Sequence, residues 1–175
     1  MELIVTAPVG MRGTAELAAQ NRERLRQRYS AFYLERAAAL EIEGMRTMPD
    51  LPGGVRAAAE ILEGGIEAAL WRLAEQTGAG LRVELQKIPI RQETIEVCNH
   101  LDADPYRLFS GGSYLIFTEN AYFVLKEIQT QGCPEAACIG VATADKKRIL
   151  YYSGVERYLT PPQRFREQKH SALQS

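Results

Sequence analysis

The segment Lys87–Phe117 constrains the fold of this chain more than any other, because it passes through several kinds of local structure in a short distance. Its residues, KIPIRQETIEVCNHLDADPYRLFSGGSYLIF, predict the end of a strand, a helix over Gln92–Leu101, a turn at Pro105 and a glycine-rich loop that opens into a strand at Tyr114–Phe117. Helices and strands therefore alternate, and the chain is expected to combine a sheet with helices.

Further elements are predicted from the spacing of apolar residues along the chain. The expected strands are 2–6, 81–88, 136–142 and 148–152, and the expected helices are 14–28, 30–44, 55–62, 66–76 and 118–131. A polar turn, TADKK, separates the last two strands and predicts a hairpin between them. Together the elements predict an α+β fold in which helices cover one face of a mixed sheet.

The length of 175 residues suits one domain of ordinary size, which can bury a core without disulfides or a metal. No linker divides the chain, so residues 1–162 are expected to form a single domain. The residues after Pro161 and Pro162 are polar, and 163–175 are expected to form a flexible tail.

Charge and hydropathy narrow the class of protein. A formal net charge of −1 argues against broad nucleic-acid binding, which needs an excess of basic residues. The apolar runs are shorter than the ~20 residues that a membrane-spanning helix needs, and no charged-then-apolar leader opens the sequence. A cytoplasmic protein without nucleic-acid or membrane partners is therefore expected.

The three cysteines, Cys98, Cys133 and Cys138, form no C-x-x-C pair, and the two histidines, His100 and His170, stand in no cluster with metal-ligand spacing. Cys98 lies inside a helical pattern and is expected to be buried as a small apolar residue. No nucleophile elbow, H-E-x-x-H motif or acid–base pair of carboxylates occurs either. The sequence thus predicts no catalytic residue and no metal ligand of its own.

Two glycine-containing segments are the candidates for binding. Glu63-Gly64-Gly65 precedes the expected helix 66–76, where backbone N–H groups at a helix N-terminus attract anions. Taken alone, the same glycine pair is better explained as a tight helix–helix turn without a ligand. Ser110-Gly111-Gly112-Ser113 precedes a strand and lacks the lysine of a P-loop, so it is either a site of close approach for a phosphate or a plain turn.

Several segments, in this order along the chain, resemble the C-terminal domain of aminoimidazole ribonucleotide synthetase-related proteins. They are ELIVTAPVGMRGTAELA (2–18), EGGIEAALWRLAE (63–75), KIPIRQETIEVC (87–98), DPYRLFSGGS (104–113) and RYLTPP (157–162). The superfamily includes selenophosphate synthetase, thiamine-monophosphate kinase and the hydrogenase-maturation dehydratase. The resemblance implies a mixed, largely antiparallel sheet with helices packed on one face.

The resemblance also implies where a ligand binds. In the family, nucleotide and substrate lie between this domain and an N-terminal domain that supplies the glycine-rich element and the acidic Mg²⁺ ligands. The family pattern His-Asp-x-Thr-Glu-Gly-Gly corresponds here to AEILEGG (59–65), in which Ala59, Glu60 and Leu62 replace histidine, aspartate and threonine. The implied substrate- or phosphate-binding residues are Glu60, Glu63, Gly64, Gly65, Ser110, Gly111, Gly112 and Ser113.

The expected function is that of the C-terminal half of an ATP-dependent enzyme. Such a half is expected to be inactive alone and to act with a separate nucleotide-binding polypeptide or as a homo-oligomer. The isolated chain is expected to need no cofactor, and ATP and Mg²⁺ are expected only with a nucleotide-binding partner. The alternative is a binding or regulatory module that has lost the ancestral activity, as the replaced motif positions allow.

Overall fold

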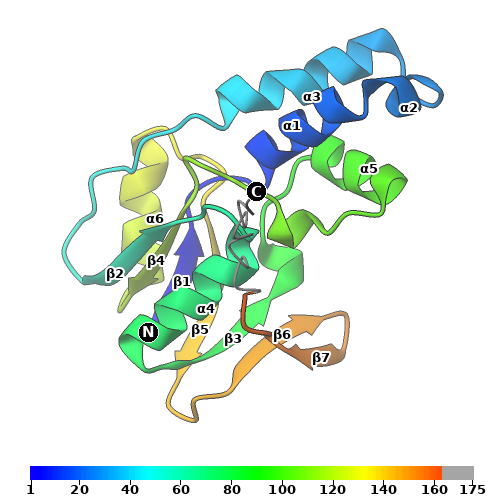
Figure 1. Ribbon diagram of the computed structural model, residues 1–175. Coiled ribbons are helices and arrows are strands. Elements are labelled where there is room, and N and C mark those ends of the chain that lie inside the picture. Colours follow the sequence, from blue (N-terminus) through cyan, green and yellow to red (C-terminus); the bar gives the residue numbers. More distant parts are fainter. Residues whose placement is uncertain (163–175) are drawn as a thin grey trace, which may run out of the picture.

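The computed structural model describes residues 1–162, whose strands form one seven-stranded sheet in the order β2-β4-β1-β5-β3-β6-β7 (Figure 1). The strands are β1 (Glu2–Val5), β2 (Val55–Glu60), β3 (Gly80–Glu84), β4 (Tyr114–Thr118), β5 (Ala137–Thr143), β6 (Arg148–Tyr152) and β7 (Val155–Tyr158). Among these strands β3 and β6 pair in parallel, and the other neighbours pair antiparallel. The expected α+β fold with a mixed, largely antiparallel sheet is therefore confirmed.

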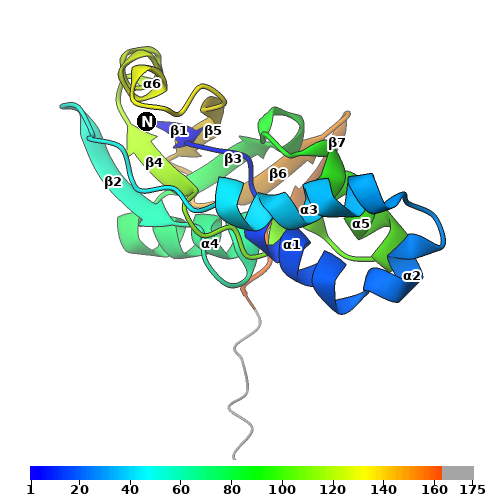
Figure 2. The ribbon, with the colours of Figure 1, turned by 90° about the horizontal axis from the view of Figure 1, so that it is seen from above.

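Helices cover both faces of the sheet, and a separate group of helices lies beside it (Figure 2). The helices are α1 (Met11–Gln20), α2 (Arg22–Arg26), α3 (Ala31–Glu43), α4 (Gly65–Thr77), α5 (Gln92–Leu101) and α6 (Ala121–Thr130), with 3₁₀ turns η1 (Leu85–Lys87) and η2 (Pro105–Arg107). No helix in residues 1–162 is both long enough and apolar enough to cross a lipid bilayer.

The expectation that helices cover a single face is corrected by the packing of β1. Leu3 and Ile4 are both fully buried, although adjacent residues of a strand point to opposite faces. Leu3 belongs to the apolar cluster that contains Leu70 of α4, whereas Ile4 belongs to the cluster that contains Val124 of α6. The middle of the sheet is therefore sandwiched between α4 and α6.

The segment expected as a helix over 55–62 is instead the edge strand β2. Its alanines favour a helix in isolation, but Ala57, Ala58 and Ala59 pair with β4 through the backbone. Backbone pairing along the edge of an existing sheet outweighs the modest helix preference of short alanine runs. As a result the chain reaches Glu63-Gly64-Gly65 from a strand, and the glycine pair makes a strand-to-helix turn.

The hairpin expected between β5 and β6 is also wrong, because β3 lies between them and pairs with both. The observed hairpin joins β6 to β7, a strand absent from the sequence-based assignment. Ser153 and Gly154 make its turn with positive φ angles of 47° and 88°, as two-residue hairpin loops require. The tail expected at 163–175 lies outside the described residues.

Candidate functional site

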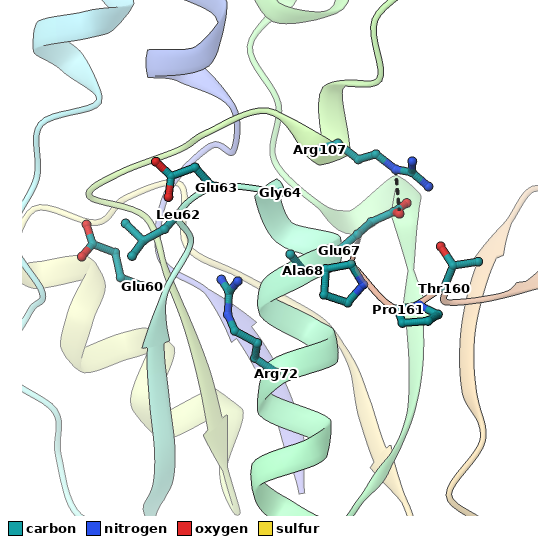
Figure 3. A pocket seen from close by; sticks show the side chains of 11 residues that line it. Glu60, Leu62, Glu63, Gly64, Glu67, Ala68, Arg72, Arg107, Thr160 and Pro161 are labelled. Atoms are coloured by element: carbon teal, nitrogen blue, oxygen red, sulfur yellow. Dashed lines mark hydrogen bonds and ion pairs between the residues drawn. The ribbon is translucent and has the colours of Figure 1, made fainter. Parts of the chain in front are cut away.

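A pocket of about 940 Å³ lies between the end of β2, the first half of α4 and the residues that follow β7 (Figure 3). The end of β2 and the turn after it contribute Glu60, Leu62, Glu63 and Gly64 to its lining. The remaining lining residues are Glu67, Ala68 and Arg72 of α4, Arg107 of η2, and Thr160, Pro161 and Pro162. Its volume falls within the range of small-molecule binding sites.

The glycine pair shapes the wall of this pocket. Gly64, the N-cap residue of α4, and Gly65 have φ angles of 83° and 65°, in the left-handed region that side chains disfavour. A Cβ atom on Gly65 would lie 2.3 Å from the carbonyl oxygen of Tyr106, so the glycine allows η2 to pack directly against α4. Gly64 faces the pocket, and the positive end of the α4 dipole therefore lies at its wall.

The Ser110–Ser113 loop is not part of the pocket lining. The buried Ser110 Oγ accepts a hydrogen bond from Gly10 N at 2.8 Å, and the buried Ser113 Oγ donates one to the carbonyl oxygen of Ala7 at 2.9 Å. Both hydroxyls thus hold the main chain after β1. A Cβ atom on Gly112 would lie 2.3 Å from the carbonyl oxygen of Gly44, so this glycine also permits close packing.

The two predicted segments nevertheless touch through the end of β2. Gly112 N donates a hydrogen bond to Glu60 Oε1 at 2.9 Å, and Gly111 N donates one to the carbonyl oxygen of Ile61 at 2.9 Å. Of the predicted residues, the pocket brings together Glu60, Glu63 and Gly64. Gly65 and the Ser110–Ser113 loop form the layer that supports it, and phosphate binding by any of them stays a prediction.

The sequence-based reasoning missed the ion cluster at Glu67. The Glu67 side chain is 5% exposed; its Oε2 lies 3.3 Å from Arg107 Nε, and its Oε1 accepts a hydrogen bond from Arg157 of β7. Arg107 Nε also lies 3.5 Å from Asp104 Oδ2. One buried carboxylate thereby joins α4, η2 and β7 around the pocket. The available signal was a charged residue in the buried stripe of an amphipathic helix.

The ionisable groups near α4 include a tyrosine outside the pocket lining. Burial raises the pKa of the Tyr106 phenol. Within residues 1–162 no group of three histidine, cysteine, aspartate or glutamate side chains is arranged to hold a metal ion.

Comparisons with known proteins agree on one family. Residues 1–153 match the family described as AIR synthase related protein, C-terminal domain. The carbamoyl dehydratase HypE of Rhizobium leguminosarum bv. viciae is 29% identical over 148 residues, which is 82% of this chain and 41% of that protein. HypE of Rhodobacter capsulatus is 32% identical over 95 residues, which is 53% of this chain and 28% of that protein.

Solved structures show the same fold. E. coli HypE has a TM-score of 0.71 and 25% identity over 93% of this chain and 50% of that one. A chain of a HypE–HypF complex has a TM-score of 0.70 and 17% identity, covering 92% of this chain and 52% of that one. This chain spans less than half of the two curated HypE relatives and about half of the solved HypE chains.

Proposed function

This chain belongs to the AIR synthase related protein, C-terminal domain family, and we propose that it supplies one side of a two-part, ATP-dependent active site. A second, nucleotide-binding half completes that site, and the domain described here does not turn over ATP by itself. The observation that carries the proposal is the coincidence of motif and pocket. The segment that corresponds to the family motif, 59–65, contributes Glu60, Leu62, Glu63 and Gly64 to the wall of the 940 Å³ pocket.

The relatives suggest that this chain acts together with another polypeptide. Both curated relatives carry the name carbamoyl dehydratase, and one solved neighbour is a HypE–HypF complex. On this basis the proposed partner is either a nucleotide-binding half or a second copy of the chain. The nucleotide half would bring ATP and Mg²⁺ to the pocket, and the domain described here would hold the substrate side.

A second candidate function is a binding or regulatory module without catalysis. Two features of the motif favour it. Leu62 is 39% exposed at the position of the family threonine, where its side chain offers no hydrogen-bond donor to a phosphate. Glu60 is engaged by Gly112 N rather than left open for a ligand. Turnover by the unaltered chain in the presence of a nucleotide half distinguishes the two functions. A half-enzyme shows it as it is, whereas a module that has lost the activity shows it, at most, after the triple variant Ala59→His, Glu60→Asp and Leu62→Thr restores the family residues.

Association with another chain is the test of the proposed function. Sedimentation velocity of the purified protein at micromolar concentrations, alone and mixed with the nucleotide-binding half of the Rhodobacter capsulatus HypE, should reveal a species heavier than the 19.5 kDa monomer. The exposed Met45 and Met48 form one candidate contact, so Met45→Glu with Met48→Glu should weaken association. Tyr122→Glu, at a still more exposed apolar position of α6, serves as the control. A strictly monomeric protein in both preparations would overturn the proposal.

A further inference from the structure

We propose that the pocket binds a small organic molecule through an oxyanion, a phosphate or a carboxylate, and that Arg72 is the residue that binds it. This inference deepens the proposed function and rests on it only in treating the pocket as the substrate side of the site. It moves the anion site away from the glycine loop 110–113 and onto α4. Neither the family motif at 59–65 nor the expectations from the sequence include Arg72.

Arg72 lines the pocket with an exposed side chain, and none of the carboxylates in residues 1–162 forms an ion pair with it. It occupies α4 one turn after Ala68 and two turns after Gly64, so the three residues form one stripe along the helix. Helical side chains lean toward the N-terminus, and Figure 3 shows the Arg72 guanidinium pointing along α4 in the direction of the Leu62–Gly64 turn.

The other acidic side chains of the pocket are occupied. Glu67 is held between Arg107 and Arg157, and Glu60 accepts the hydrogen bond from Gly112 N. Glu63 is exposed at the rim, as Arg72 is, and water screens the charges of both side chains. An incoming anion therefore does not have to displace a carboxylate of the described residues from Arg72.

Arg107 supplies a second cationic group on the far side of Ala68. Its Nε contacts Glu67 and Asp104, and this arrangement fixes the guanidinium at the pocket wall. Within the described residues its two terminal amino groups form no hydrogen bond, so both remain available to a ligand. Guanidinium forks match the geometry of phosphate and carboxylate oxygens, which favours an oxyanion over a halide ion.

The rest of the lining explains why the ligand is organic. Leu62, Ala68, Pro161 and Pro162 present apolar surface, and Thr160 adds one hydroxyl. Inorganic phosphate would fill a small part of about 940 Å³ and would leave this apolar surface in contact with water. A molecule with an apolar body and one anionic group uses both kinds of surface at once. The loop 110–113 offers such a molecule neither apolar surface nor a free hydroxyl, since its two serine hydroxyls are hydrogen-bonded to the main chain.

Binding of simple aromatic probes to the purified chain tests the assignment without ATP or a partner. Phenyl phosphate and benzoate carry the two candidate head groups on the same ring, and benzyl alcohol lacks the charge. Calorimetric titration gives each Kd, and arginine Nε–Hε NMR signals report which guanidinium responds. Arg72→Gln should weaken binding of the better anion about tenfold or more, since a charge-assisted hydrogen bond is worth at least about 1.5 kcal/mol. Arg72→Lys should restore part of the affinity.

Arg26→Gln is the matched control, because Arg26 is an exposed helical arginine on α2, far along the chain from the pocket. It should leave every Kd unchanged, and benzyl alcohol should bind more weakly than either anion. The proposal is overturned if Arg72→Gln, folded as judged by circular dichroism, binds as the parent does. It is also overturned if the amide shifts centre on residues 110–113, or if neither anion binds in the millimolar range. These outcomes leave the partner-association test of the proposed function unaffected.

Discussion

The carboxylate of Glu60 accepts a hydrogen bond from the backbone N–H of Gly112 across 2.9 Å, and this contact ties the last residue of β2 to the loop before β4. The two segments are 52 residues apart in the chain, and both were predicted to contact a phosphate. In the folded domain they contact each other. The carboxylate of Glu60 in the pocket wall therefore already has a hydrogen-bond donor without a bound ligand.

Glu60→Ala is predicted to lower the free energy of unfolding by about 1.5 kcal/mol, since it leaves the partly buried Gly112 N–H without an acceptor. Urea denaturation followed by circular dichroism measures the effect. Glu63→Ala is the control, because Glu63 is exposed and forms no hydrogen bond within the described residues; its change should stay within about 0.5 kcal/mol. Equal effects of the two variants would show that the Glu60 contact does not stabilise the domain.

Gly65→Ala is predicted to destabilise the domain far more than Gly78→Ala. The two glycines have nearly the same φ angle, 65° and 64°, so both variants carry the same backbone strain of about 1 kcal/mol. A Cβ atom on Gly65 would lie 2.3 Å from Tyr106 O, whereas nothing lies within 4 Å of one on Gly78. Thermal unfolding should therefore show a cost of about 2 kcal/mol or more beyond the control. Similar melting temperatures for the two variants would contradict the close packing of η2 on α4.

Glu67→Ala is predicted to cost about 2 kcal/mol of stability, because it leaves Arg107 and Arg157 without their shared partner. This loss of stability is smaller than that caused by breaking a fully buried ion pair, because both arginines are about half exposed. Glu75→Ala removes the exposed partner of Arg148 and should cost less than about 1 kcal/mol. Guanidinium denaturation screens charges, so urea is the denaturant to use. If Glu75→Ala lowered the stability and Glu67→Ala did not, the stabilising role of Glu67 would be contradicted.

Cys98 is predicted to resist alkylation until strongly alkaline pH. Burial raises the pKa of its thiol from 9.0 to about 11, and the thiolate is the reactive form. Because the unfolded thiol ionises near pH 9 and the folded one does not, ionisation favours the unfolded state as the pH rises between these values. Iodoacetamide labelling read by mass spectrometry should modify the less buried Cys138 first at pH 8. Faster labelling of Cys98 than of Cys138 at that pH would contradict the prediction.

Much of the fold could be predicted because local signals and tertiary structure agree. The helix Gln92–Leu101 was predicted with the bounds it has, and α3 begins after Ser30, whose side chain accepts a hydrogen bond from Tyr33 N as an N-cap. The strand β2 was not predicted, because its alanines favour a helix and only pairing with β4 makes it a strand. The strand β7 is exposed along its length and carries no burial pattern.

Likewise, only part of the candidate site could be predicted from the sequence. Glu60, Glu63 and Gly64 were identified from a motif that is continuous in the sequence, and they line the pocket. The cluster of Glu67 with Arg107 and Arg157 joins residues 40 and 90 positions apart. No local pattern specifies such partners, since they are brought together only when η2 and the β6–β7 hairpin pack around α4.

Phosphate release by the purified chain in the presence of Mg·ATP tests the central claim most directly. If the domain is one half of a two-part active site, the isolated chain should release phosphate at the background rate, because the residues that would clamp the nucleotide phosphates belong to the other half. Turnover well above background that disappears in a folded Arg72→Gln or Glu67→Gln variant would contradict the claim and would assign a complete active site to this chain.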